Sequence, residues 1–308
     1  MQLVNLKQIT TERRNERTMN IDTLSTIEML KALNHEDKTV PLAVEKALPQ
    51  VSVVVDKLYD VLYNGGRLIY MGAGTSGRIA ILDASECPPT YGTDPDMVIA
   101  LIAGGDQAMT VAIEGAEDDE DSAIEDLKRI NLTSNDFVIG LSASGRTPYV
   151  VSGVNYAKSI GAQTACITTS ENSILAKSVD YPIEAITGAE PITGSTRMKS
   201  GTAQKLICNM ITTATMIKLG KVYENLMIDV QPTNQKLVSR ARHIIYEITG
   251  VSFEEAGDYL ERFQSVKKAI FAILTGVEDH QQVEHYLELE KGHLRNALNR
   301  FNKDHQIN

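Results

Sequence analysis

Short apolar runs alternate with amphipathic stretches through the middle of the chain. The predicted strands are residues 67–71, 98–103, 137–141, 163–168 and 181–186. The predicted helices around them are residues 75–86, 115–130, 147–161 and 173–178. Strands joined through helices run parallel, because the chain must cross back over the sheet before it pairs again. The pattern therefore predicts an α/β fold in which helices flank a parallel sheet.

A longer helix is predicted ahead of the first strand. It follows Pro41 and ends at Asn64-Gly65-Gly66, a typical helix stop. Its apolar face is predicted to consist of Val44, Leu48, Val51, Val54 and Leu58. Residues 1–40 are polar with short amphipathic pieces, and we expect an arm that packs on a neighbouring molecule. The amphipathic pieces include Ile21, Leu24, Ile27 and Leu30.

The chain changes character after about residue 235, where amphipathic helical segments replace the alternation of strands and helices. These segments are Phe253–Phe263, Val266–Leu274 and Val283–Phe301, separated by Gly250, Gly257 and Gly276. We expect a small C-terminal helical subdomain without catalytic residues. The predicted organisation is an N-terminal arm over 1–40, the sheet domain with its preceding helix over 41–225, and the helical subdomain over 235–308.

Composition and charge limit the classes of partner. Hydrophobic residues make up 43% of the chain, enough for a real core, and the net charge of −10 argues against nucleic acids and anionic membranes. No window is apolar enough to span a bilayer and no signal peptide is recognisable, so we expect a cytoplasmic protein. The three cysteines and six scattered histidines lack metal-ligand spacing, so we expect reduced thiols and no metal.

Two loops repeat one design, a strand running into small residues, hydroxyls and an arginine. The first loop is Gly72–Arg78 and contains Thr75 and Ser76, and the second loop is Ser142–Thr147. Main-chain N–H groups in such a loop at the start of a helix bind anions. Neither loop has the lysine of a Walker A motif or the spacing G-x-G-x-x-G, which favours a small phosphate ester. A tight strand-to-helix connection is the alternative.

A third polar stretch follows the last predicted strand. Residues 188–202 are rich in turn-forming residues and lead into an apolar helix that extends to about Leu219. Ser195, Thr196 and Lys199 fall near the start of that helix, where an anion is again favoured. Capping of the helix by Ser195 or Thr196 and contact with a ligand both stay open.

These segments carry a family resemblance. The second loop resembles the phosphate loop of the sugar isomerase (SIS) domain. Four segments resemble the N-acetylmuramic acid 6-phosphate etherase family, which is related to the glucokinase regulatory proteins. They are Thr11-Glu12-x-Arg14-Asn15, Gly72–Arg78, Asp83–Gly92 and Ile192–Lys199. The resemblance covers almost the whole chain and implies an SIS fold.

The resemblance implies cleavage of the D-lactyl ether of N-acetylmuramic acid 6-phosphate to N-acetylglucosamine 6-phosphate and D-lactate, during recovery of peptidoglycan sugars. It assigns acid/base roles to Glu86 and Glu117, and no cofactor is expected. It places hydroxyls on the phosphate from Ser76, Ser142, Ser144 and Thr147. With the rest of the loops, the expected substrate-binding residues are Thr75, Ser76, Ser142, Ser144, Gly145, Thr147, Ser195 and Lys199.

Elimination is the chemistry that suits such an ether. Once the sugar ring opens to its aldehyde, a base removes the C2 proton, an acid protonates the departing lactate oxygen, and water adds at C3. Glu86 suits an acid/base role, because an apolar helix and a rigid Pro88-Pro89 turn fix its direction. Which glutamate is the acid and which is the base stays open.

Glu117 lies in the acidic run Glu114–Glu120, and the residues alone do not choose among these carboxylates. Acidic runs are commonly solvated faces or helix starts. The resemblance selects Glu117, and Glu114, on the same predicted helical face, is the main alternative.

Two other functions stay open. A sugar-phosphate-binding regulator would hold its ligand without turnover. The glucokinase regulatory proteins that this chain resembles carry two SIS modules in tandem, whereas the chain has strands for only one. An aldose–ketose isomerase would also remove the C2 proton, but SIS isomerases often have glutamate where this chain has Arg146. We also expect a homodimer, because a lone sheet domain would leave the apolar face of residues 41–63 uncovered.

Overall fold

The computed structural model describes residues 10–230 and 234–306. The chain packs as two compact units. The first unit consists of Met1–Ser85 and Pro95–Thr212, and the second of Glu86–Asp94 and Thr213–Asn308. The first contains the sheet and the second contains the C-terminal helices. The domain boundaries expected from the sequence stay a prediction.

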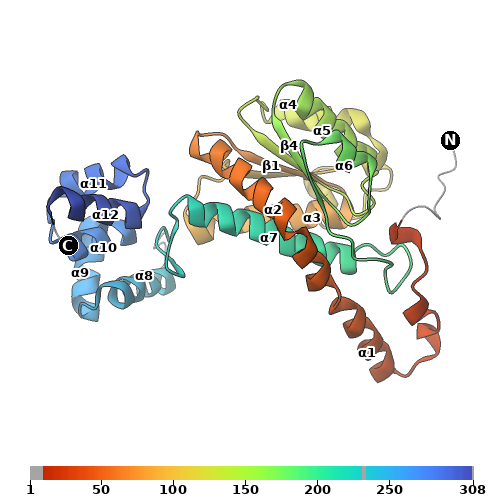
Figure 1. Ribbon diagram of the computed structural model, residues 1–308, viewed down its shortest axis with the longest axis horizontal. Coiled ribbons are helices and arrows are strands. Elements are labelled where there is room, and N and C mark those ends of the chain that lie inside the picture. The colour runs from red at the N-terminus through yellow and green to blue at the C-terminus, as the bar shows by residue number, and fades with distance from the viewer. Residues whose placement is uncertain (1–9, 231–233, 307–308) are drawn as a thin grey trace. The chain divides into compact units, whose positions relative to one another are not determined.

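Five parallel strands form the sheet of the first unit (Figure 1). They are β1 (Leu68–Gly72), β2 (Val98–Ile102), β3 (Phe137–Leu141), β4 (Gln163–Thr168) and β5 (Tyr181–Glu184), in the spatial order β2-β1-β3-β4-β5. β1 and β3 are buried along their whole length, as expected for strands covered by helices on both faces. The predicted strands and the predicted α/β fold are confirmed.

Helices cover both faces of this sheet. They are α2 (Val40–Tyr63), α3 (Gly74–Tyr91), α4 (Glu120–Arg129), α5 (Pro148–Ser159), α6 (Ile174–Ser178) and α7 (Lys199–Lys218), of which α3 and α7 continue into the second unit. Helix α1 (Thr26–Asp37) belongs to the N-terminal arm. On one face, Ile69 and Met71 pack in a core with α4, α5 and α6. On the other, the Tyr70 hydroxyl donates to Asp83 of α3, which accepts from Asn209 of α7.

Helix α2 ends at Tyr63 with Asn64 as its C-cap, which agrees with the helix stop that the sequence predicts. The predicted apolar residues that are buried are Val44, Val51, Val54 and Leu58. The prediction is wrong for Leu48, which is 42% exposed. The buried stripe advances alternately by three and four residues, so Ala47 takes the inward position instead.

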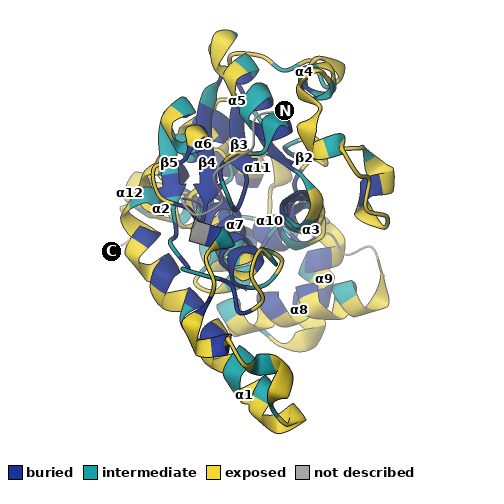
Figure 2. Cartoon of the chain, turned by 90° about the vertical axis from the view of Figure 1, so that its right-hand side faces the viewer, coloured by how far each residue is buried: buried dark blue, intermediate teal, exposed yellow. Residues whose placement is uncertain are grey.

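The N-terminal arm consists of three 3₁₀ turns followed by α1. The turns are η2 (Thr10–Glu12), η3 (Glu16–Thr18) and η4 (Ile21–Thr23). The four apolar residues at helical spacing do not share one helix, because the backbone is extended at Leu24 before α1 begins. Ile27 and Leu30 are exposed, and Figure 2 shows that most of α1 is exposed. Packing of this arm on a neighbouring molecule stays a prediction.

The second unit is helical, which confirms the C-terminal helical region. It contains a short hairpin, β6 (Val222–Tyr223) and β7 (Leu226–Met227), and α8 (Gln235–Thr249), α9 (Phe253–Phe263), α10 (Val266–Thr275), α11 (His280–Leu289) and α12 (Leu294–Asp304). The single segment predicted over 283–301 is wrong, because Gly292, at φ +81°, separates two helices. Gly257, in contrast, does not separate two helices as the sequence predicts. It lies inside α9, where a Cβ would stand 2.9 Å from Cζ of Arg242.

Within residues 10–230 and 234–306, no helix combines the length and the apolar character that crossing a bilayer requires. The same residues contain no group of three or more His, Cys, Asp or Glu side chains placed to hold a metal ion. All three cysteines are buried free thiols. The cytoplasmic location stays a prediction.

Candidate active site

The two hydroxyl-rich loops leave the sheet from neighbouring strands. β1 and β3 pair in parallel with Gly72 opposite Leu141, so both loops begin at the same edge of the sheet. β2 lies on one side of β1 and β3 on the other, which makes this edge the point where the strand order reverses. Open parallel sheets bind ligands at such a point, beyond the carboxyl ends of the strands.

The first loop opens helix α3 and packs tightly against the sheet. A Cβ on Gly77 would lie 2.5 Å from Cγ1 of Ile102, so a side chain there would displace the loop. Ser76 is buried, and its hydroxyl donates to Oε1 of Gln204 in α7 over 2.9 Å. Because the first N–H groups of a helix have no partner within it, those of Thr75 and Ser76 are available to an anion.

The second loop is a compact turn with open main-chain donors. Gly145 has φ +63°, and a Cβ there would lie 2.3 Å from Cβ of Ser173, so only glycine fits. The hydroxyls of Ser142 and Thr147 lie 2.8 Å apart and share a hydrogen bond. Among the described residues, none accepts a hydrogen bond from the main-chain N–H of Ser144 or Thr147. The loop therefore has the donors of an anion site.

The third polar stretch already holds an anion of its own. Glu190 is fully buried and accepts hydrogen bonds from the main-chain N–H groups of Lys199 and Ser200, at 2.8 and 2.9 Å, at the start of α7. Its carboxylate thus occupies the helix terminus that the sequence offers to a ligand. Ser195 is half-buried outside the helix, and its contact with substrate stays a prediction.

Ser200 also connects α7 to the second loop. Its hydroxyl donates to Glu190 over 2.7 Å and accepts from the Thr169 hydroxyl over 2.8 Å. The main-chain N–H of Thr169 donates to the carbonyl of Ala143 in the second loop. With Gln204 on Ser76, the start of α7 therefore contacts the first loop directly and the second loop through Thr169.

Lys199 lies in a buried ion pair with the N-terminal arm. Its ammonium donates to Glu36 of α1 over 2.9 Å, and both side chains are 1% exposed. Glu36 also accepts from Arg17 and from Asn15. The Arg17 hydrogen bond is the largest cause that lowers the pKa of Glu36 to about 2, against the opposing effect of burial, with Lys199 adding to it. Direct contact of Lys199 with substrate stays a prediction.

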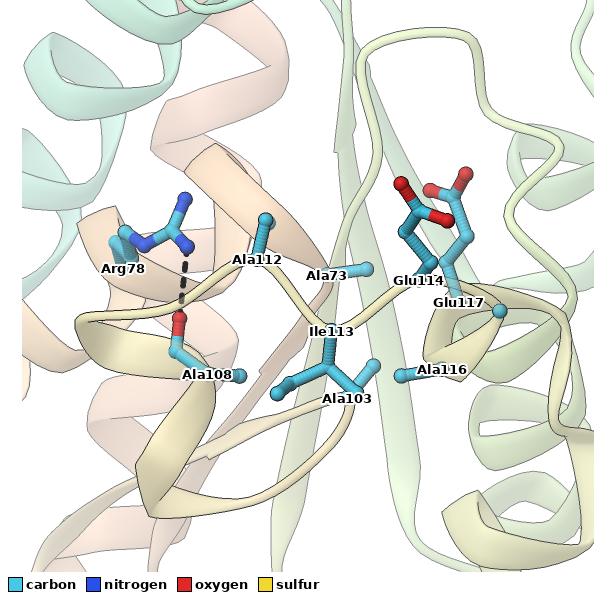
Figure 3. A pocket seen from close by; sticks show the side chains of 11 residues that line it. Ala73, Arg78, Ala103, Ala108, Ala112, Ile113, Glu114, Ala116 and Glu117 are labelled. Atoms are coloured by element: carbon cyan, nitrogen blue, oxygen red, sulfur yellow. Dashed lines mark hydrogen bonds between the residues drawn. The ribbon is translucent and has the colours of Figure 1, made fainter.

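A cavity of about 280 Å³ lies beside the first loop, all within the first unit. Ala73 and Gly74 of that loop line it, together with Arg78 of α3. Glu114 and Glu117 line it too, and Figure 3 shows them next to each other, with Arg78 across the cavity. The structure thus brings Glu117 and its main alternative to the same cavity as the first loop.

The two glutamates are placed by a turn and not by one helical face. The helix predicted over 115–130 is wrong at its start. Residues Ala116–Asp118 form the 3₁₀ turn η6, and the side chain of Asp119 then caps α4 by accepting from the N–H of Ser122. Gly115, at φ +77°, separates Glu114 from η6. The two glutamates therefore line the cavity from either side of a left-handed glycine.

Arg78 is a cavity residue that the sequence analysis does not single out. Its Nε donates to the carbonyl of Met109 over 2.9 Å and its Nη2 to that of Ala108 over 2.8 Å. Both carbonyls belong to the 3₁₀ turn η5 (Asp106–Met109). Every residue has a main-chain carbonyl, so a sequence pattern does not indicate which carbonyls will accept from an arginine. The only signal for Arg78 as a cavity residue was its position in the first loop.

Glu86 lies further along α3 at an exposed position, where the second unit begins. The predicted Pro88-Pro89 turn is wrong, because both prolines lie inside α3, which ends at Tyr91. Pro88 and Pro89 have no N–H to donate to the preceding turn, whereas Gly92 still donates to the carbonyl of Pro88, so the helix continues past both prolines. The catalytic role of Glu86 stays a prediction.

Comparison with known proteins identifies the family. The model of the glucokinase regulatory protein N-terminal SIS domain matches residues 50–158. The N-acetylmuramic acid 6-phosphate etherase of Clostridium beijerinckii is 53% identical over 300 residues, which cover 97% of this chain and 98% of the relative. The chain belongs to the N-acetylmuramic acid 6-phosphate etherase family. The etherase 2 of Vibrio parahaemolyticus agrees, with 54% identity over 96% of this chain and 99% of the relative.

Membership in the etherase family confirms the family expected from the motifs, and with it an enzyme of the carbon–oxygen lyase class. Among solved structures, a phosphoheptose isomerase from Francisella tularensis is 15% identical with a TM-score of 0.48, covering 63% of this chain and 100% of that one. Those values are too low to bear on function.

Proposed function

We propose that this member of the etherase family cleaves the D-lactyl ether of N-acetylmuramic acid 6-phosphate with water and releases N-acetylglucosamine 6-phosphate and D-lactate. The observation that carries the proposal is 53% identity, over 97% of the chain, to a relative of that name. The geometry supports it, because two loops with open anion donors and a cavity with two glutamates share one edge of the sheet.

In this proposal the 6-phosphate lies on the second loop. The hydroxyls of Ser142, Ser144 and Thr147 donate to it, together with the open N–H groups of the loop and the start of α5. Ser76 and Thr75 approach from the first loop, which begins level with the second. Gly145 contributes by letting the main chain turn where no side chain fits.

The proposed reaction is elimination followed by hydration. In the open-chain aldehyde, a carboxylate removes the C2 proton while the bond between C3 and the lactate oxygen breaks. The second carboxyl protonates that oxygen, and D-lactate leaves. Water then adds its oxygen to the C3 of the unsaturated aldehyde and a proton returns to C2, so every atom of the ether and of one water is accounted for.

Glu117 is the proposed acid/base residue at the cavity, and Glu86 is the proposed second carboxyl. Glu117 is supported by its place at the cavity beside the first loop. Glu114 lines the same cavity and is the alternative to Glu117. Glu86 rests on the motif that begins at Asp83.

The test is release of D-lactate from N-acetylmuramic acid 6-phosphate. The wild-type protein is expected to release it, and Glu117→Gln to lose about 10²–10⁴-fold in kcat, because glutamine keeps the shape but transfers no proton. Glu114→Gln is the matched control at the same cavity and is expected to keep most activity. A wild-type protein that releases no D-lactate refutes the function. Loss of activity in Glu114→Gln with retention in Glu117→Gln reassigns the residue.

A further inference from the structure

Arg78 has unused hydrogen-bonding capacity inside the cavity. A guanidinium has five N–H groups, and two hydrogen bonds tie Nε and Nη2 to the carbonyls of Met109 and Ala108. Among the described residues, no carboxylate forms an ion pair with it, and its side chain is half-buried. The arginine is therefore fixed in direction while its charge is left without a counter-ion.

The cavity lies on the opposite side of the first loop from the proposed phosphate site. Apart from the residues of the first loop, its lining comes from the segment after β2, between Ala103 and Glu117. The second loop follows β3, and β1 separates β2 from β3 in the sheet. Two strand spacings, about 10 Å, thus lie between the two regions. A ligand with its phosphate on the second loop would reach the cavity with its far end.

The far end of the proposed substrate carries a second anion. N-acetylmuramic acid 6-phosphate has a phosphate on C6 and, on C3, a lactyl ether with a methyl group and a carboxylate. The cavity offers matching groups, since the methyl side chains of Ala73, Ala108 and Ala112 line the same cavity as the guanidinium. Figure 3 also shows Glu114 and Glu117 across the cavity from Arg78. If Arg78 binds the carboxylate of the lactyl group, the ether oxygen of that group would lie between Arg78 and the two glutamates.

We infer that Arg78 binds the carboxylate of the lactyl group and so selects the lactyl ether over sugar phosphates that lack it. The inference rests on the proposed function. Arginine suits this task because its planar N–H groups match a carboxylate in pairs. The two bonds to η5 hold the guanidinium at the cavity, and they also hold η5 against α3.

The experiment compares two ligands that differ only in the lactyl group. KM is measured for N-acetylmuramic acid 6-phosphate, and the inhibition constant for N-acetylglucosamine 6-phosphate, which keeps the phosphate and the N-acetyl sugar. In Arg78→Gln, KM is expected to rise at least about tenfold, because a charge-assisted contact is lost, while the inhibition constant stays within about twofold. Arg129→Gln, an exposed arginine of α4, is the control and should change neither.

Arg78→Lys provides a second variant in case the glutamine variant does not fold. It keeps the charge and loses the paired geometry, so KM should rise at least about threefold with an unchanged inhibition constant. If both constants rise together, Arg78 contacts the shared sugar phosphate and the inference is overturned. If neither changes, Arg78 only holds η5 and the inference is overturned as well. A wild-type protein without D-lactate release refutes the proposed function instead.

Discussion

The hydroxyls of the second loop differ in whether they form hydrogen bonds within the protein. Those of Ser142 and Thr147 share one hydrogen bond, and Ser142 is 2% exposed. Ser144 is half-buried, and its hydroxyl forms no hydrogen bond with any residue that the structure describes. The first two hydroxyls therefore maintain the loop as well as offering acceptor and donor sites, whereas the third is left for a ligand.

This difference predicts separate effects of two alanine substitutions. Ser144→Ala should raise the KM for the sugar phosphate about tenfold without changing the free energy of unfolding, because it removes one charge-assisted donor. Ser142→Ala should raise KM similarly and also lower the free energy of unfolding by about 1 kcal/mol, because Thr147 loses its partner.

Steady-state kinetics and chemical denaturation of the two variants measure these effects. Ser159→Ala is the control, because Ser159 is exposed at the end of α5 and its hydroxyl donates to the carbonyl of Tyr156 within the same helix. If KM is unchanged in both Ser142→Ala and Ser144→Ala, the second loop does not hold the phosphate.

Helices α1 and α7 are joined by one buried carboxylate, although 163 residues separate Glu36 from Lys199. Glu36 is fully buried and pairs with Lys199 in the first turn of α7. In the same helix, Gln204 accepts a hydrogen bond from Ser76 of the first loop, and Ser200 accepts one from Thr169, which contacts the second loop. Removal of one partner from a buried ion pair leaves the other uncompensated, which is costly. The N-terminal arm is thus tied by charge to the helix behind both loops.

The depressed pKa of Glu36 predicts how this link depends on pH. Its pKa is about 2 in the folded protein and ordinarily 4.5, so the ionised carboxylate stabilises the fold above about pH 4.5. That stability, about 3 kcal/mol, is lost as the pH falls from about 4.5 to about 2. The wild-type protein should therefore exceed Glu36→Gln in free energy of unfolding near neutral pH, and the difference should shrink below pH 4.5.

Denaturant titrations at several pH values measure this difference. Glu16→Gln, an exposed glutamate of the same arm, is the control and should follow the wild-type protein. A difference between the wild-type protein and Glu36→Gln that stays constant from pH 7 to pH 3 would contradict the role given to the carboxylate.

The strands were predictable because each is a short apolar run, and burial on both faces of a parallel sheet demands such runs. The loops were predictable because glycine and hydroxyl residues follow two of these strands directly. Glu36 and Glu190 were not, because the partners of Glu36 include Lys199, 163 residues away, and those of Glu190 lie across a loop at the start of α7. Glu190 accepts a hydrogen bond at the start of α7, and Glu36 accepts one from Lys199. The local pattern of apolar and polar residues predicts neither contact.

The positions of the two cavity glutamates could not be predicted from the sequence either, although these residues are close together in the chain. The sequence places Glu114 and Glu117 in one acidic run, and only the left-handed turn at Gly115 and the cap at Asp119 decide where the helix begins. The position of Arg78 is even harder to predict from the sequence, since its hydrogen-bond partners are main-chain carbonyls of η5. Motif resemblance selected Glu117 where residue chemistry alone left several carboxylates open.

For the whole molecule, the described residues contain a single five-stranded parallel sheet. Helices of the first unit still expose large apolar side chains. On α1 and α2 these are Ile27, Leu30, Leu42, Leu48 and Val53, each at least 42% exposed. Apolar groups distributed along two helices favour association with a second copy of the chain.

We therefore expect a homodimer. Sedimentation at micromolar concentration should give a species of twice 33.8 kDa. Leu42→Glu combined with Leu48→Glu should shift it toward the monomer, because charges on that surface oppose apolar contact. Exposed Lys177 of α6 offers a control in Lys177→Glu, which should leave the mass unchanged. A wild-type species of 33.8 kDa would contradict the expectation.

Isotopic labelling of the products tests most directly whether the chain cleaves the lactyl ether by elimination and hydration. The measurement is mass spectrometry and NMR of both products formed from N-acetylmuramic acid 6-phosphate in deuterated and in ¹⁸O-labelled water. Elimination followed by hydration is expected to place deuterium at C2 and ¹⁸O at C3 of N-acetylglucosamine 6-phosphate, with no ¹⁸O entering D-lactate at its hydroxyl. An unlabelled C2 together with ¹⁸O in the lactate hydroxyl would show displacement at the lactate carbon and would contradict the account.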